Sequence, residues 1–381
     1  MFFFMRKNAQ TILILLTAMN LRLAVTAVTP LFGTIQHALH VSGTLPALLV
    51  TIPLLCFAAG AMVTPRLSRQ VGIKPLLLIT NGLLIGANLC RPSSPGALVL
   101  GTLLIGGAIA VLNVLIPIMI AQTTTTPTAV SRLTSAYSVI MNGLAAGGTA
   151  AAIPLAHWLG WATVLRLFAL PAVVGLLAAL VTPAIATPPT TTSQPPVFTL
   201  LRHDRQARGL TLFMGLQSLI FYSLVTWLPT IFQALGATAD QAGQLLAAFQ
   251  FIGIPAALVL NRVTNDRWLL TILAGGYLLG MLSLGWSGLG WWLAALLLGF
   301  TCSLIFSTAL TWIATSSPVT NQVAARSAVA QSLGYLLAAG GPVVFGRLHE
   351  WGHSWSPVLL SFLVLMGLTI AVGARVLRQR R

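Results

Sequence analysis

Acidic residues are nearly absent from this chain. Only four of its 381 residues are Asp or Glu, and charged residues of both signs make up 6% of the sequence. A soluble globular protein carries about 25% charged residues, which cover its water-facing surface. The scarcity of charge therefore excludes an ordinary soluble domain. It indicates a bilayer as the solvent, where about 20 apolar residues make one helical span.

Cysteine is also rare, and its three copies, Cys56, Cys90 and Cys302, fall inside apolar stretches. An odd, widely spaced set excludes a disulfide framework and a cysteine metal site. Phosphate-binding loops, dinucleotide-binding glycine signatures and nucleophile elbows are missing too, so ATP-driven pumping and hydrolysis have no support. We therefore expect no enzyme activity, no cofactor and no bound metal.

Basic residues, in contrast, are plentiful, and they give the chain a net charge of +16. They recur as small clusters between apolar stretches and form no single face or tail, which argues against a nucleic-acid partner. With the N-terminus inside, sixteen of the twenty fall on the cytoplasmic side, the pattern that orients membrane helices. The other four lie within spans or near their outer ends. Both termini are thus expected in the cytoplasm.

The apolar stretches divide into twelve predicted spans, six in each half of the chain. The predicted spans are 11–35, 44–65, 75–91, 96–121, 133–158, 161–182, 209–235, 241–263, 268–287, 290–315, 326–348 and 356–377. A segment rich in Pro and Thr and then basic, residues 184–208, separates an N-terminal half, 1–183, from a C-terminal half, 209–381. We expect an all-α integral membrane protein with a cytoplasmic linker.

The two halves share a short motif. The sequence LAAGG at 144–148 in the fifth predicted span recurs at 337–341 in the eleventh, and Pro30 and Pro229 each lie near the outer end of the first span of their half. Chance is the alternative, because Ala and Gly are abundant in membrane helices. The order and spacing favour two six-helix pseudo-repeats related by duplication.

Arg22 is the exception in an otherwise uncharged interior. It lies about 16 Å along the first predicted span at 1.5 Å per residue, near the bilayer centre. A charge there costs roughly 2.5 to 3.5 kcal/mol on insertion scales, and no predicted span holds an acid that could neutralise it. Snorkelling or pairing with backbone carbonyls is the alternative. We favour a functional cation that binds an anionic or electron-rich substrate.

Neutral polar side chains in the spans complete a predicted substrate site. The candidates are Arg22, Thr26, Asn113, Tyr137, Asn142, Tyr222, Gln250, Gln331 and Tyr335. Each neutral one alone favours a hydrogen bond between helices, and together they offer donors and stacking surfaces. All four acidic residues are expected in loops, so a proton relay of side chains has no candidate. Arg91 and Arg166 lie nearer span ends and are expected to snorkel.

Four segments resemble the cyanate and nitroimidazole transporter branch of the major facilitator superfamily. They are residues 20–22, residues 113–117, Tyr222 with residues 227–229, and residues 330–335 with 341–342. The resemblance implies a multi-pass inner-membrane permease of a bacterium, which moves small organic or pseudohalide solutes by alternating access at a site between the halves. The superfamily's loop after the second span normally carries an Asp. Here residues 69–74 keep Gly72 and Lys74 without that Asp, which puts the usual gating salt bridge in doubt.

We therefore expect a secondary-active or facilitative transporter of a small anionic or electron-rich solute, such as a cyanate-like or nitroimidazole-like compound or a small carboxylate. A drug efflux permease of the same fold and a non-transporting membrane receptor are the alternatives. Direction of transport and coupling by symport or exchange stay open. The expected partners are a small-molecule substrate and the lipid bilayer, with the protein acting as a monomer.

Overall fold

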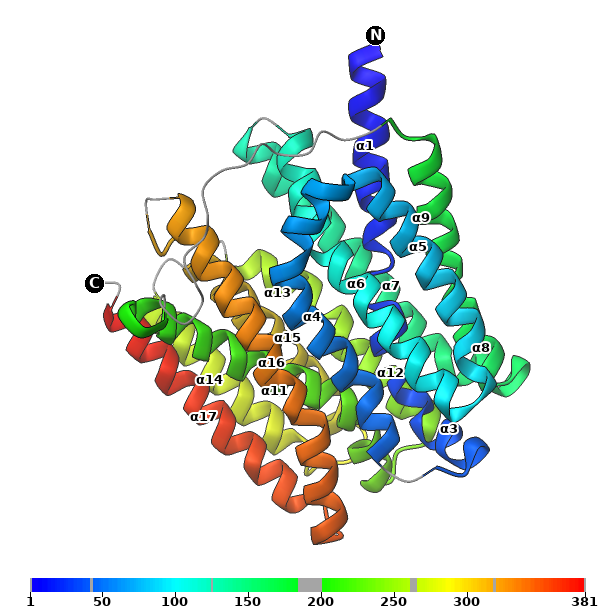
Figure 1. The fold of residues 1–381 in the computed structure, drawn as a ribbon. Coiled ribbons are helices and arrows are strands. Elements are labelled where there is room, and N and C mark those ends of the chain that lie inside the picture. The colour runs from blue at the N-terminus through cyan, green and yellow to red at the C-terminus, as the bar shows by residue number, and fades with distance from the viewer. Residues whose placement is uncertain are drawn as a thin grey trace. The chain divides into compact units, whose positions relative to one another are not determined.

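The computed structural model describes residues 2–41, 44–124, 126–183, 201–260, 266–317 and 320–379. Every regular element within these ranges is a helix, and the chain divides into two compact units, Met1–Thr191 and Thr192–Arg381 (Figure 1). Residues 184–200, most of the predicted linker, lie outside the described residues, as does the end of the eighth predicted span at 261–263.

Ten helical stretches in the described part of the chain are long and apolar enough to cross a membrane. The helices of the N-terminal unit are α1 (Phe2–Ala18), α2 (Leu23–Thr26), η1 (Thr29–Leu31), α3 (Phe32–Leu39), α4 (Thr44–Val71), α5 (Ile73–Cys90), η2 (Arg91–Ser93), α6 (Pro95–Thr123), α7 (Pro127–Leu159), α8 (Trp161–Leu167) and α9 (Leu170–Val181). Those of the C-terminal unit are α11 (Arg205–Ala234), α12 (Ala239–Phe251), α13 (Gly253–Leu260), α14 (Asp266–Ser283), α15 (Leu289–Ala314), α16 (Thr320–Gly352) and α17 (Ser356–Gln379).

These helices follow the predicted spans closely. The ten apolar stretches coincide with ten predicted spans, and α12 with α13, and then α14, stand where the eighth and ninth were expected. The predicted all-α membrane fold is confirmed, and the helices fit twelve spans. Helix ends differ from the predicted ones by a few residues, and α11 begins at Arg205, inside the predicted linker. Asp204 caps that end by accepting backbone N–H groups from Gln206 at 2.9 Å and Ala207 at 3.0 Å.

The first span is not the single regular helix that the apolar run predicts. It is interrupted after Ala18, where Met19, Asn20 and Leu21 each donate their N–H to the residue three positions back, at 3.1 to 3.3 Å. Such tight bonds replace the four-residue spacing of an α-helix. Arg22 then stands directly before α2, with φ −130° and ψ −36°. The interruption falls near the middle of the apolar stretch Asn8–Leu39.

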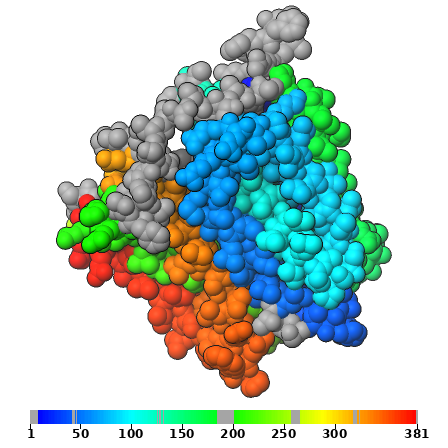
Figure 2. All heavy atoms as spheres, in the orientation of Figure 1, coloured from blue at the N-terminus to red at the C-terminus, as the bar shows by residue number. Residues whose placement is uncertain are grey.

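Small residues bring α4 and α6 together in the N-terminal unit. A methyl group on Gly60 would lie 2.6 Å from Cβ of Ala110, and one on Gly106 would lie 2.8 Å from Cα of Pro53. In the space-filling view, side chains of α4, α5 and α6, blue to cyan, close this face of the unit (Figure 2). Close contact through small residues is the common way in which membrane helices pack.

The repeated LAAGG motif makes the same kind of contact in both units. A methyl group on Gly148 of α7 would overlap the side chain of Leu23 in α2. One on Gly341 of α16 would overlap Oγ of Ser223 and lie 3.3 Å from Cγ of Leu219, both in α11. The first glycine of each pair has open space beside it. The second glycine thus packs the fifth helix of each half against the first, which supports duplication.

Helices α11 and α16 of the C-terminal unit are joined at further points along their lengths. A methyl group on Gly215 would lie 3.3 Å from Cα of Gly334. Trp227 donates its indole N–H to the carbonyl oxygen of Pro342 at 2.8 Å. The two helices therefore hold each other by backbone proximity and by a buried hydrogen bond.

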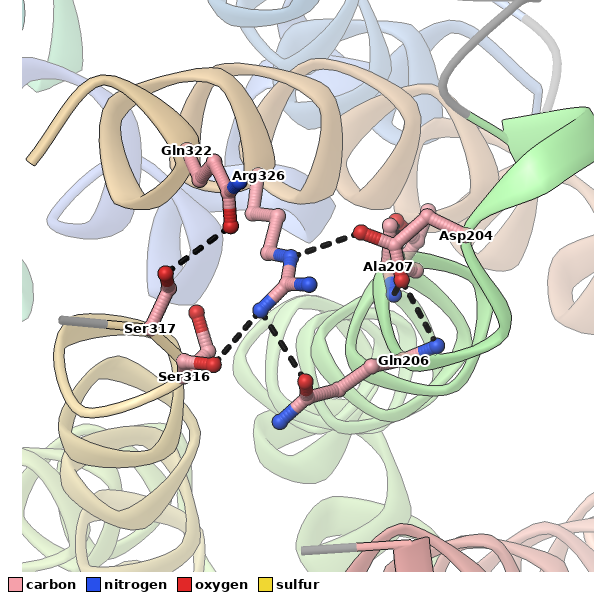
Figure 3. A network of polar contacts seen from close by, with 8 residues as sticks. Asp204, Gln206, Ala207, Ser316, Ser317, Gln322 and Arg326 are labelled. Atoms are coloured by element: carbon pink, nitrogen blue, oxygen red, sulfur yellow. Dashed lines mark hydrogen bonds and ion pairs between the residues drawn. The ribbon is translucent and has the colours of Figure 1, made fainter. Parts of the chain in front are cut away.

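One end of the same pair carries the ion pair between Asp204 and Arg326, with Nε and Oδ2 2.7 Å apart. Arg326 of α16 also donates to the side chain of Gln206 at 3.0 Å and to the carbonyl oxygen of Ser316 at 2.6 Å (Figure 3). Ser316 follows α15, so a single guanidinium joins α11, α16 and the segment after α15. Planar guanidinium suits such multiple contacts.

The acidic residues lie at or next to helix ends, whereas all four were expected in loops. Asp204 precedes α11, and Asp266 begins α14, where its carboxylate accepts the indole N–H of Trp312 at 3.4 Å. Asp240 lies in the first turn of α12, and Glu350 lies near the C-terminal end of α16. Asp240, Asp266 and Glu350 are thus helical residues, and the loop assignment was wrong for them. None of the four lies in the middle of a helix.

Candidate functional site

Arg22 and Asn142, both predicted site residues, are in direct contact. Arg22 donates from Nη1 to Oδ1 of Asn142 at 2.5 Å, across 120 residues of sequence. The pair is partly buried and joins the interruption of the first span to the middle of α7. The structure therefore places the guanidinium beside a neutral amide acceptor at the point where the first span is not helical.

Two further side chains hold the interrupted segment. Asn20, which is 5% exposed, donates from Nδ2 to the carbonyl oxygen of Pro171 at 3.2 Å. Arg91 donates from Nη1 to the carbonyl oxygen of Ala24 at 3.2 Å. Residues 20, 22 and 24 are thus each attached to a different neighbouring element. Irregular backbone at membrane depth requires such partners, because lipid offers none.

Arg91 does not snorkel, and that expectation was wrong. The residue is 1% exposed, and its Cζ lies 5.8 Å from the ring centroid of Phe168. Among the described residues its Nε and Nη2 have no hydrogen-bond partner. Its burial follows from close packing against Gly101, where a methyl group would lie 3.2 Å from Cα of Arg91. Arg166, in contrast, is exposed, as expected.

The other candidates in the N-terminal unit differ in their surroundings. Thr26 is 1% exposed, and its hydroxyl donates to the carbonyl oxygen of Arg22 at 3.3 Å, so it supports the backbone after the interruption. Tyr137, on α7 with Asn142, is half-buried and lies within reach of the Arg22 charge. Asn113 lies on α6 and is half-buried. The structure thus brings Arg22 and Asn142 into contact, and Tyr137 lies on the same helix as Asn142, five residues before it.

Two candidates in the C-terminal unit, Tyr222 and Tyr335, belong to an aromatic cluster with Phe221 and Phe249. Tyr222 of α11 and Tyr335 of α16 meet edge to face, with ring centroids 6.3 Å apart. Phe221 extends the cluster towards α12 through Phe249, at 5.9 Å. Gln331 lies one turn before Tyr335 on α16 and donates to Oγ of Ser327 at 2.9 Å. These rings offer stacking surfaces to a planar solute.

Gln250 completes that set, at the end of α12. It is 4% exposed and lies next to Phe249, which is itself buried. The C-terminal candidates therefore comprise two tyrosines and two amides, and they add no formal charge of their own.

Sequence reasoning missed two residues that hold the interruption, Asn20 and Arg91. Asn20 stands two positions before Arg22, within the segment 20–22 that carries part of the family resemblance. Its position beside Arg22 could have indicated a role in holding that residue. Arg91 is followed by Pro92, and this pair begins the 3-10 turn η2. A proline after the last apolar residues predicts a turn, but burial of the side chain depends on Ala24 and Phe168, which are distant in sequence.

Comparison with known proteins agrees with this architecture. The model of the Major Facilitator Superfamily matches residues 14–342. The nucleoside transporter NupG has a solved structure that superposes with a TM-score of 0.76 over 96% of this chain and 99% of that one, at 13% identity. That likeness concerns the fold alone.

Three bacterial transporters share more of the sequence. The uncharacterized transporter YycB of Bacillus subtilis (strain 168) is 34% identical over 93% of this chain and 90% of its own length. The 2-nitroimidazole transporter of Escherichia coli (strain K12) is 33% identical over 94% and 93%. The cyanate transport protein CynX of the same organism is 30% identical over 69% of each chain. The chain therefore belongs to the Major Facilitator Superfamily, in the branch that holds the cyanate and nitroimidazole transporters.

Proposed function

We propose that this transporter moves a small anionic or electron-rich solute, and that Arg22 binds the negative charge. The solute class includes cyanate, nitroimidazoles and small carboxylates. The two E. coli relatives, named for cyanate and for 2-nitroimidazole, support this class. Cyanate is a small anion, and a nitro group presents two oxygens with partial negative charge to a guanidinium. Tyr137 and Asn142 lie beside the charge, and Tyr222, Tyr335, Gln250 and Gln331 supply rings and amides.

A single observation carries the proposal. Arg22 is the fifteenth of the 32 residues in the stretch Asn8–Leu39, at an interruption of the helix, and its guanidinium donates to the neutral amide of Asn142. The sequence of the N-terminal unit contains nine Lys and Arg residues and no Asp or Glu. The positive field of this half therefore favours an anion at the centre of the span.

Transport into proteoliposomes tests the function. Purified protein is reconstituted, and uptake of labelled cyanate, 2-nitroimidazole and benzoate is measured with and without a pH gradient. We expect saturable flux of at least one of them, and a faster flux with the gradient would indicate proton coupling. Binding without flux would contradict the proposal and favour a receptor, and neither flux nor binding of any of the three would contradict the proposed solute class.

We also propose an inner-membrane monomer with both termini in the cytoplasm, as the distribution of basic residues indicates. Cysteine labelling tests the orientation in a background in which the exposed Cys90 is replaced by Ser. Thr190→Cys should react with a membrane-impermeant reagent only after the cells are permeabilised. Ser93→Cys, which is exposed between α5 and α6, should react in intact cells. The opposite pattern would invert the topology.

Arg91→Met should fold and yet bind anions roughly tenfold more weakly. Methionine fills a similar volume without a buried charge, so the free energy of unfolding should change little. The hydrogen bond to the carbonyl oxygen of Ala24 is lost, which is worth about 1.5 kcal/mol for a charged donor. Because Ala24 lies two residues after Arg22, the guanidinium should be held less well. Melting temperature and binding of cyanate or benzoate measure the two effects.

Arg166→Met is the matched control for that variant, since Arg166 belongs to the same unit and is exposed. Its affinity should equal that of the parent. An Arg91→Met variant with parental affinity would show that the contact with Ala24 does not position the site.

A further inference from the structure

Asn142 accepts a hydrogen bond from Arg22 that an anion could accept in its place. Its Oδ1 lies 2.5 Å from Nη1 of Arg22, a short hydrogen bond from a charged donor. An amide oxygen satisfies the donor, which a buried guanidinium needs. It carries a partial charge only, so it leaves the positive charge of Arg22 in place.

An oxygen or nitrogen of an anion would bind the same donor more strongly. It brings a full negative charge, and attraction between two full charges grows as water is excluded. It can also engage two donors of the guanidinium at once, as carboxylates do. The amide of Asn142 is therefore the weaker of two competing acceptors.

We propose that Asn142 is a resident acceptor, which holds Arg22 in the empty site and is displaced from Nη1 when the substrate anion binds. This rests on the anion-binding function proposed above. The amide would keep the donor satisfied between transport cycles. It would also limit affinity, because each anion must replace an existing bond, and a transporter has to release what it binds.

Packing between α7 and α2 keeps Asn142 within reach without help from the hydrogen bond. Gly148, six residues after Asn142 on α7, lies so close to α2 that a methyl group would overlap Leu23 and lie 3.5 Å from Cβ of Ala27. Arg22 stands directly before Leu23. The two backbones are thus fixed by the glycine contact, so that removing the amide should leave Arg22 near its present position.

Two substitutions separate a resident acceptor from an ordinary ligand. Asn142→Asp places a permanent carboxylate on Arg22, and it should weaken binding of cyanate and benzoate at least tenfold. Without any anion, it should melt at or above the temperature of the parent saturated with anion. Added anion should then shift it little. Asn142→Ala removes the competitor and should bind as tightly as the parent or up to tenfold tighter.

Asn88→Asp is the matched control, because it adds the same charge at a buried position on α5 of the same unit and Asn88 is not a predicted site residue. It should weaken binding less than Asn142→Asp does. Equal losses in the two variants would assign the effect to the general field of an added charge and overturn the proposal. A tenfold loss in Asn142→Ala would overturn it too, since Asn142 would then be a ligand or a positioning residue.

Arg22→Ala distinguishes failure of this inference from failure of the proposed function. If Arg22→Ala binds anions as tightly as the parent, both the proposed function and the resident-acceptor proposal are wrong. If Arg22→Ala loses binding while Asn142→Asp keeps the parental affinity, only the resident-acceptor proposal is wrong. Melting temperatures of all variants without anion show whether each is folded. If Asn142→Asp does not fold, the affinity of Asn142→Ala still tests the resident-acceptor proposal.

Discussion

Arg22→Ala should abolish measurable anion binding while the protein still assembles in the membrane. Removing one partner of a desolvated, charge-assisted contact costs about 2 to 5 kcal/mol. This corresponds to roughly 30-fold to several thousand-fold in affinity. Assembly should survive, because the variant removes a charge from a span in which such a charge is costly. Calorimetry with cyanate or benzoate on purified protein measures the loss.

Arg22→Lys is the informative companion. It keeps the charge and loses the planar, two-pronged donor, so it should bind more weakly than the parent and more tightly than Arg22→Ala. Parental affinity in Arg22→Ala would remove the main support for an anionic substrate. Equal affinities of Arg22→Lys and the parent would show that charge alone is recognised.

Gly299→Ala should destabilise the C-terminal unit by disturbing the packing of α15 on α12. A methyl group there would overlap the carbonyl oxygen of Phe249 in α12 and lie 2.8 Å from Cγ2 of Ile252. Backbone cannot rotate away as a side chain can, so α12 and α15 would have to separate. Overpacking costs about 1 to 3 kcal/mol and occasionally more. We expect a marked fall in melting temperature and in the amount of protein in the membrane.

Gly275→Ala is the control for this variant. Gly275 lies on α14 of the same unit and has open space where the methyl group would go. Glycine within a helix is less stable than alanine by roughly 0.5 to 1 kcal/mol, so this variant should melt at the same temperature or slightly higher. Similar losses in both variants would disprove the close approach of α15 to α12.

The fold could be predicted largely from the sequence, because lipid imposes a length and a polarity on every span. Apolar runs bounded by Arg, Pro and Gly predict helices whose ends differ from those observed by only a few residues. Pro171 illustrates what such signals do not resolve. It stands at the start of α9, where a proline fits, but the predicted sixth span ran through it from α8 as one helix.

The candidate site could be predicted only in part. Arg22 is visible because a charge in an apolar run is rare, and Asn142 because a polar residue in a span usually finds a partner. The interruption at residues 19–22 carries no Gly or Pro that would announce it. Asn20 is tied to Pro171 and Ala24 to Arg91, and contacts across 151 and 67 residues cannot be read from local sequence.

The attachment of α11 to α16 has a mechanical consequence. Arg326 clamps one end of the pair to Asp204, Gly341 lies against Leu219 farther along, and Trp227 bonds to Pro342 beyond that. Three contacts along the two helices oppose both sliding and separation of α11 and α16. Tyr222 of α11 and Tyr335 of α16 can therefore move during a transport cycle only as one unit. A solute stacked on either ring would therefore meet the same aromatic pair throughout the cycle.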